Sequence, residues 1–185
     1  MSLDVVIFRL INNLAGQNGV LDILGIFAAT FLLPILLFLL LPVVLLSRKI
    51  VEEKWWEFIV RALCVGGLAY VARTILGWLF FRWRPFAALP DVNQLISMAP
   101  AESSFPSGHA SVAFALAFYV FFHDRGWGWS FIVMAALIAI GRVFVGVHYP
   151  LDVIAGLVVG YLAAWLVRKF EKMEWGKVGR VLRIK

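Results

Sequence analysis

The sequence is poor in charge and in cysteine. Only 15% of its 185 residues are Asp, Glu, Lys or Arg, whereas a soluble domain carries about 25%. A soluble core of this size has no room for the 63% of residues that are apolar, so we expect lipid to be the solvent. Cys64 stands alone, which excludes an internal disulfide. The chain also opens without the pattern of a removable signal peptide.

Long apolar runs predict an all-α fold, a single integral-membrane helical bundle formed by residues 1–185. One crossing needs about 20 apolar residues. Five runs approach that length, at about 20–47, 57–81, 107–122, 128–146 and 151–167. They are continuous, whereas a membrane β-barrel needs short segments of alternating polarity. We therefore expect about five transmembrane helices within residues 19–168.

The two ends of the chain predict how the bundle lies in the membrane. Residues 1–18 carry an apolar stripe opposite a polar face, which is typical of an interfacial helix. Residues 169–185 are rich in Lys and Arg, and the positive-inside rule places this tail and the basic loop 48–56 in the cytoplasm. The predicted location is the plasma (inner) membrane, with the 82–106 loop outside. No nucleic-acid partner is expected, and the oligomeric state stays open.

Three polar clusters interrupt the apolar background, each at the end of a predicted span. They are FFRWRPF (80–86), FPSGH (105–109) and GRVFVGVHYPLD (141–152). With five crossings, all three span ends lie on the outer side of the membrane. The main feature of the sequence is therefore the convergence of two histidines, two or three arginines and an aspartate at one membrane face.

The FPSGH cluster has the chemistry of an anion site. Pro106 begins a helix without losing a hydrogen bond, and Ser107 can cap that helix or bind an anion. Gly108 lets the backbone approach a ligand closely. The unpaired amides of such a helix start, together with the helix dipole, attract phosphate. His109 would then stand in the first turn of the helix.

The other two clusters supply groups for phosphoryl transfer. His148 lies just before a helix that Pro150 begins, and Asp152 lies in its first turn. The carboxylate can fix the imidazole tautomer and leave the other ring nitrogen free to attack. Arg84 and Arg142 offer forked donors that match phosphoryl oxygens. Together these groups suit transfer of a phosphoryl group without a metal or other cofactor.

Each motif also has a plainer explanation. PSG alone is usually a helix start, a lone histidine in an apolar protein is more often structural, and an Arg-Pro pair commonly anchors a helix end. A metal site formed by His109, His148 and Asp152 is a further alternative, although arginines nearby disfavour a cation. The conjunction of the motifs, in this order and on one face, favours a functional site.

The motifs resemble those of the type-2 phosphatidic acid phosphatases, which share a site with acid phosphatases and vanadium haloperoxidases. The family pattern is Lys, six residues and Arg-Pro, then PSGH, then Ser-Arg with a His six residues after that Arg and an Asp four further on. The matching residues here are Arg84-Pro85, Pro106 to His109, Arg142, His148 and Asp152. The length and the stretch GVHYPLDV also resemble the bacitracin-resistance type of undecaprenyl pyrophosphate phosphatase.

The resemblance implies a covalent mechanism. His148 would attack phosphorus and become a phosphohistidine, oriented by Asp152. His109 would protonate the leaving oxygen and then activate water. The residues implied to hold the phosphoryl oxygens are Arg84, Ser107, Gly108 and Arg142.

Two positions depart from the family pattern. Gly77 stands where the family has Lys, and Gly141 where it has Ser. Arg73, one helical turn before Gly77, is a candidate replacement and is kept among the phosphate-binding residues, although its side chain is expected to lean toward the helix N-terminus and away from the site. Arg82 is the other candidate, with anchoring of the helix as its alternative role.

A phosphorylated lipid is the predicted substrate, because a site at the end of lipid-facing helices suits a molecule whose tail stays in the bilayer. The resemblance favours hydrolysis of undecaprenyl pyrophosphate to undecaprenyl phosphate. Phosphatidic acid and phosphatidylglycerol phosphate are alternative substrates. A lipid-phosphate binding or transport protein without turnover is the alternative of another class, but a transporter would need a polar path across the membrane.

Overall fold

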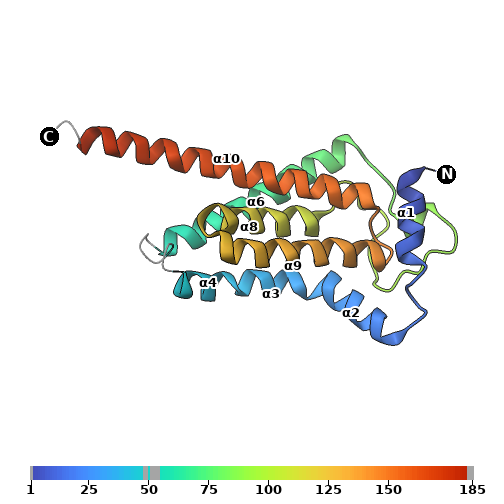
Figure 1. Cartoon of the computed structure of the whole chain (residues 1–185). Helices are drawn as coiled ribbons and strands as arrows, with labels where there is room; N and C mark the ends of the chain where they lie inside the picture. Colours follow the sequence, from blue (N-terminus) through green and yellow to red (C-terminus); the bar gives the residue numbers. More distant parts are fainter. Residues whose placement is uncertain (1, 48–49, 51–54, 183–185) are drawn as a thin grey trace.

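The computed structural model is a bundle of helices (Figure 1) and describes residues 2–47, 50 and 55–182, with side chains as far as residue 171. Over these residues it contains helices and no strand, which confirms the all-α prediction. The helices are α1 (Leu3–Asn12), α2 (Gly19–Thr30), α3 (Leu32–Phe38), α4 (Leu40–Leu46), α6 (Trp55–Leu79), α7 (Pro85–Ala88), α8 (Gly108–His123), α9 (Arg125–Phe144) and α10 (Pro150–Leu182).

Four of the predicted spans correspond to single helices. By length and composition, α6, α9 and the Pro150–Glu171 part of α10 can each cross a membrane. The helix α8 is apolar but shorter, with 16 residues. It lies at the centre of the bundle, packed against α6, α9 and α10, and most of its side chains are buried.

The first predicted span is divided into α2, α3 and α4, and α2 meets the Leu32–Leu46 stretch at a bend of 48°. Two prolines explain the divisions. A proline ring clashes with the carbonyl four residues earlier in a helix. For Pro34 and Pro42 these positions are Thr30 and Phe38, which are the last residues of α2 and α3. If the bend lies within one crossing, this segment is a fourth span.

Two glycines bring α10 against α8 near the start of both helices. A Cβ atom at Gly156 would lie 2.9 Å from the Cβ of Ala110, and one at Gly160 would lie 2.6 Å from the amide nitrogen of Ala115. Small residues spaced four apart allow membrane helices to approach this closely. The packing therefore holds the PSGH and HYPLD motifs side by side.

The helix α1 lies across the end of the bundle where α6 and α9 end and α8 and α10 begin (Figure 1). Its buried Asn12 donates hydrogen bonds to the carbonyl oxygens of Phe144, at 2.8 Å, and Asn93, at 2.9 Å. Arg9 donates to the carbonyl of Asp91 at 2.7 Å. A helix thus forms within residues 1–18 as expected, and its location at the membrane interface stays a prediction.

The predicted sidedness depends on segments that the structure covers only in part. The helix α10 continues without a break past residue 168 into the predicted tail. Positions 48–49, 51–54 and 183–185, where much of the predicted basic loop and the end of the tail fall, lie outside the described residues. The division of the chain into interfacial helix, membrane core and cytoplasmic tail therefore stays a prediction.

Candidate active site

The three polar clusters meet at one end of the bundle, around a cavity of about 220 Å³. Six of the eight residues proposed from the sequence line it: Arg73, Arg84, Gly108, His109, Arg142 and His148. The described residues that complete the wall are Leu33, Tyr70, Met98, Glu102 and Val112. The two imidazole rings and three guanidinium groups therefore share one small space, although they come from α6, α8, α9 and two loops.

Arg84 and Arg142 are buried with unmet hydrogen-bonding capacity. Among the described residues, their Nε atoms are the buried side-chain polar atoms that lack a hydrogen-bond partner. Buried donors are nearly always paired in native proteins, because an unpaired one costs about 1–3 kcal/mol. Both residues line the cavity, so its wall carries two guanidinium groups whose hydrogen-bonding capacity the described residues do not use in full.

The contacts of His148 fix its tautomer. Nδ1 lies 2.9 Å from the carbonyl oxygen of Ser104, which can only accept, so Nδ1 carries the proton. Nε2 lies 3.4 Å from Nη1 of Arg84, which can only donate, so Nε2 keeps its lone pair. Burial lowers the pKa of His148 to about 4; Asp152 opposes this effect, and the cations of Arg142 and Arg84 add to it. The ring is therefore neutral at pH 7, with the lone pair of Nε2 beside the guanidinium of Arg84.

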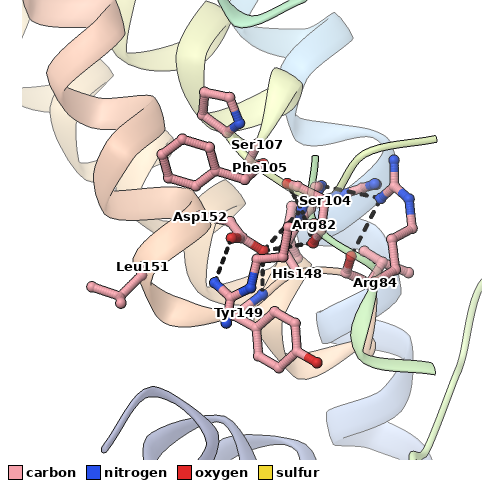
Figure 2. A network of polar contacts seen from close by, with 12 residues as sticks. Arg82, Arg84, Ser104, Phe105, Ser107, His148, Tyr149, Leu151 and Asp152 are labelled. Atoms are coloured by element: carbon pink, nitrogen blue, oxygen red, sulfur yellow. Dashed lines mark hydrogen bonds and ion pairs between the residues drawn. The ribbon is translucent and has the colours of Figure 1, made fainter. Parts of the chain in front are cut away.

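Asp152 belongs to the network of polar contacts around His148 (Figure 2) but not to the described cavity wall. Its Oδ2 atom lies 3.8 Å from Nδ1 of His148, beyond hydrogen-bond distance. Oδ2 instead accepts from the hydroxyl of Ser104 at 2.6 Å and from the amide of Tyr149 at 2.8 Å. The expected direct bond between Asp152 and His148 is thus replaced by a link through Ser104, whose carbonyl binds the ring and whose hydroxyl binds the carboxylate.

Sequence reasoning missed Ser104. The residue is fully buried in a chain that has little buried polarity, and its hydroxyl lies 3.3 Å from Nδ1 of His148. The signal in the sequence is its position at the start of the SFPSGH stretch, three residues before the serine that was chosen. Only the fold shows that it faces the aspartate 48 residues further on.

Ser107 and Gly108 have local roles at the start of α8. Ser107 is the N-cap, its fully buried hydroxyl accepts from the amide of Ala110 at 3.5 Å, and it does not belong to the described cavity wall. Gly108 does line the cavity. A Cβ atom there would lie 3.3 Å from Nε of Arg73, so the missing side chain makes room for the guanidinium.

Arg73 faces the cavity, and the expectation that its side chain leans away from the site is wrong. Its Nε donates to the carbonyl of Pro106 at 3.4 Å. The reason is that the segment before α8 packs down along α6 beside Gly77, where a Cβ atom would lie 3.1 Å from the carbonyl oxygen of Phe105. The cavity therefore lies level with Arg73, nearly two turns before the end of α6, and little space is left for a side chain at position 77.

Gly141 has a packing role where the family pattern has Ser. A Cβ atom there would lie 2.9 Å from the amide nitrogen of Ala29 and 3.0 Å from the Cβ of Ala28. The glycine thus lets α9 approach the backbone of α2. The next residue, Arg142, then reaches the carbonyl of Ala29 with Nη1 at 3.3 Å, which helps to fix its guanidinium.

The two remaining alternatives find little support in the geometry. Arg82 does not belong to the described cavity wall, because its guanidinium is bound between Asp4 and Asp152. The proposed metal site does not form either. Over the described part of the chain, no three His, Cys, Asp or Glu side chains come together as metal ligands would.

Comparison with known proteins identifies the family. The model of the PAP2 superfamily matches residues 58–175, a stretch that contains all three polar clusters. The chain belongs to the PAP2 superfamily. It is a membrane-bound lipid phosphatase, and the predictions of the family, of an integral-membrane helical fold and of an enzyme are confirmed.

Three similar proteins are informative. The chain is 36% identical over 165 residues to the "Bacitracin transport permease protein BcrC" of Bacillus licheniformis. The aligned region covers 89% of this chain and 79% of the relative. The chain is 30% identical over 178 residues to "Undecaprenyl-diphosphatase BcrC" of Bacillus subtilis, covering 96% and 89%. The crystal structure of Aquifex aeolicus LpxE superposes with a TM-score of 0.72 at 31% identity, covering 91% of this chain and 96% of that one.

Proposed function

We propose that this phosphatase hydrolyses undecaprenyl diphosphate to undecaprenyl phosphate and inorganic phosphate, through a phosphohistidine on His148, at the outer face of the membrane. The observation that carries the proposal is the pair of buried guanidinium Nε donors left unpaired beside two imidazole rings. The guanidinium groups of such a cavity offer positive charge and hydrogen bonds to a phosphoryl group. The imidazole of His148, in the same wall, offers a nucleophile.

In the proposed first step, Nε2 of His148 attacks the terminal phosphorus, and the bond from phosphorus to the bridging oxygen breaks. His109 gives a proton to that oxygen as the lipid monophosphate leaves. In the second step, His109 removes a proton from water, which attacks the phosphohistidine. The P–N bond breaks, inorganic phosphate leaves, and both rings return to their starting states. The neutral His148 tautomer found in the structure supports this assignment of nucleophile.

Arg73 is proposed to supply the positive charge that the family lysine provides elsewhere. The cavity wall contains three arginines and one carboxylate, that of Glu102, which pairs with Arg84 at 3.2 Å and is 62% exposed on its side chain. The three cations suit the oxygens of a diphosphate. Since position 77 is crowded, a cation one turn earlier on the same helix is the substitute that the packing permits.

The surroundings of the cavity support a lipid substrate. A neighbouring cavity of about 450 Å³ shares Tyr70, Arg73 and Glu102 with it and continues over Trp78, which is 81% exposed. A further groove of about 800 Å³ lies beside the PSGH segment, and apart from Arg82 its described lining consists of apolar side chains of α6, α10 and the connecting loop. Apolar surface next to a phosphate cavity suits a molecule whose tail remains in the bilayer.

The choice of undecaprenyl diphosphate over other lipid phosphates is supported by the Bacillus subtilis relative, which is named as an undecaprenyl-diphosphatase and aligns over nearly the whole chain. The name of the Bacillus licheniformis relative speaks of transport. Hydrolysis and transport of a lipid phosphate are therefore the two outcomes that an experiment must separate.

The proposal is tested with purified protein in lipid nanodiscs and a panel of undecaprenyl diphosphate, phosphatidic acid and phosphatidylglycerol phosphate. We expect phosphate release to be fastest from undecaprenyl diphosphate. With substrate labelled at the terminal phosphate, His109→Ala should accumulate label on the protein after an alkaline quench, and His148→Ala should not. Equal rates on all three lipids would contradict the substrate, whereas binding without release would favour a transport or binding protein.

A further inference from the structure

A second polar network joins Asp152 to Arg82 (Figure 2) and, through Arg82, to Asp4 of the N-terminal helix. The guanidinium of Arg82 donates from Nη1 to Oδ1 of Asp152 at 2.8 Å, and from Nη2 to Oδ2 of Asp4 at 2.6 Å. Its carbon Cζ lies 3.8 Å from the ring centre of Tyr149. The other oxygen of Asp4 accepts from the amide of Leu151, in the first turn of α10, at 2.9 Å.

We propose that Arg82 and Asp4 are positioning residues of the active site, which hold the carboxylate of Asp152 and thereby the tautomer and orientation of His148. The inference rests on the proposed role of His148 as nucleophile. It makes α1, which lies outside the PAP2 match at residues 58–175, a part of the catalytic apparatus.

The contacts of Asp152 show why its orientation depends on Arg82. One carboxylate oxygen is held by Arg82 and the other by the Ser104 hydroxyl and the Tyr149 amide. The side chain is fully buried, and a buried carboxylate is stable only when it is paired. Arg82 is its cationic partner, since His148 is neutral and lies 3.8 Å away.

The next link connects the carboxylate to the nucleophile. Asp152 accepts from the hydroxyl of Ser104, and the carbonyl of the same residue accepts from Nδ1 of His148. If the carboxylate turned away, Ser104 would lose its acceptor and the carbonyl its fixed position. The proton on Nδ1, which leaves Nε2 free to attack, would then no longer be held in place.

Asp4 acts on the opposite side of the guanidinium. Burial by itself would lower the pKa of Arg82, but the Asp152 and Asp4 carboxylates outweigh that effect and raise the pKa above its ordinary value. Asp4 also binds the start of α10 through Leu151, so it fixes Arg82 relative to the helix that carries Asp152. Arg82 does not belong to the described wall of the phosphate cavity, but it does line the apolar groove of about 800 Å³ beside the PSGH segment, so kcat and KM must be measured separately to distinguish positioning of Asp152 from binding of the lipid.

The test compares Arg82→Met, Arg82→Lys and Asp4→Asn with the wild type, measuring kcat and KM for phosphate release from undecaprenyl diphosphate. We expect Arg82→Met to lower kcat by about 10- to 100-fold, as when a metal-binding histidine loses the outer hydrogen-bond partner that orients it, with KM within about threefold. Arg82→Lys should recover part of the loss, because an ammonium can bind one carboxylate but lacks the fork. Asp4→Asn should lower kcat by about threefold or more, again without raising KM.

Arg9→Gln is the matched control. It removes a hydrogen-bonded anchor of the same helix, toward Asp91, but touches neither Arg82 nor Asp152. We expect its kcat to stay within about twofold of the wild type, the scale of an exposed polar contact. If Arg9→Gln lowers kcat as much as Asp4→Asn does, loss of helix docking explains both and the inference is wrong.

Four further outcomes decide the question. The double variant Asp4→Asn/Arg82→Met should have the kcat of Arg82→Met, since Asp4 acts through Arg82, and additive losses would contradict that route. A raised KM with unchanged kcat in Arg82→Met would assign Arg82 to substrate binding and overturn the inference. If the wild type is active and Arg82→Met has the same kcat, the positioning role alone is overturned. If the wild type releases no phosphate from any lipid, the proposed function is overturned as well.

Discussion

The two ends of the bundle bury the same kinds of side chain for different purposes. At the end opposite the cavity, Glu171 of α10 accepts from the hydroxyl of Tyr119 at 2.8 Å and from Arg168 at 3.1 Å, and it lies 3.7 Å from Arg61. His123 completes this set, which we call the distal cluster, because its Nε2 lies 3.0 Å from Arg168. Histidine, arginine, carboxylate and hydroxyl groups thus occur at both ends.

The difference lies in whether the charges and hydrogen bonds are matched. In the distal cluster a nearly buried carboxylate meets two arginines that are each more than a quarter exposed, and Nδ1 of His123 bonds to the carbonyl of Tyr119. At the cavity, Arg84 and Arg142 are almost wholly buried and each leaves an Nε donor unpaired. Burial of polar groups therefore does not by itself mark the candidate active site. What sets it apart, among the described residues, is an excess of buried cations and two guanidinium donors without a partner.

Loss of the nucleophile should produce the largest contrast between the ends. We expect His148→Ala to lower kcat by about 10⁴-fold or more, because without Nε2 no covalent intermediate forms. His123→Ala in the distal cluster should keep kcat within about threefold, since its ring lies far from the reaction. Phosphate release in nanodiscs measures both. Normal turnover by His148→Ala would rule out the covalent mechanism.

Removing one guanidinium should give the next largest effect. Arg142→Gln should lower kcat by about 100-fold, the size typical of losing a donor to the transition-state oxyanion. Arg168→Gln removes the same group from the distal cluster and should leave kcat within about twofold. Orthovanadate, measured as a competitive inhibitor, should bind less tightly to Arg142→Gln only. Equal effects of the two variants would show that the charge excess is not what defines the site.

The pH dependence should reflect the burial of His148. Because its pKa is lowered to about 4, the ring is neutral and nucleophilic above that pH and gains a proton below it. We expect kcat/KM, as far as His148 controls it, to hold from neutral pH down to about pH 5 and to fall through about pH 4. A histidine with an ordinary pKa would lose activity already near about 6.5. An acid limb near that value that moves with His148 variants would contradict the assignment.

A change in the distal cluster should alter stability and leave catalysis nearly intact. Glu171→Gln removes the buried negative charge that pairs with both Arg61 and Arg168. We expect the free energy of unfolding to fall by about 1–3 kcal/mol, toward the lower end of this range because solvent screens the two partly exposed arginines. Denaturation in detergent and the activity of the folded fraction measure the two effects. A loss of kcat larger than the loss of folded protein would show that the ends are coupled.

The smallest effect is expected from a chelator. If the arginines supply the positive charge at the cavity, EDTA should leave phosphate release within about twofold of the untreated enzyme. If phosphate release is lost completely and a divalent cation restores it, the reaction depends on a metal, and the arginines alone do not supply the positive charge at the cavity.

The sequence predicted the helices and the residue types of the site from local signals. Apolar runs located the spans, and PSGH and HYPLD marked the starts of α8 and α10. It did not predict the position of Arg73, because the general lean of helical side chains says nothing of how far the loop before α8 descends along α6. It missed Ser104 for a similar reason, since a serine beside a more familiar motif looks ordinary until its partner, 48 residues away, is known.

The amino-acid sequence by itself determined that this is an integral membrane protein, that it is helical, and that it carries the PAP2 motifs. Hydropathy, proline positions and helix starts are properties of short stretches of chain. Only the tertiary structure decided that the Nε donors of Arg84 and Arg142 lack a partner among the described residues, that Ser104 links Asp152 to His148, and that Arg82 binds Asp152 to α1. These features arise where segments distant in the chain meet, and the balance of charges and hydrogen bonds there depends on every group that the packing brings together.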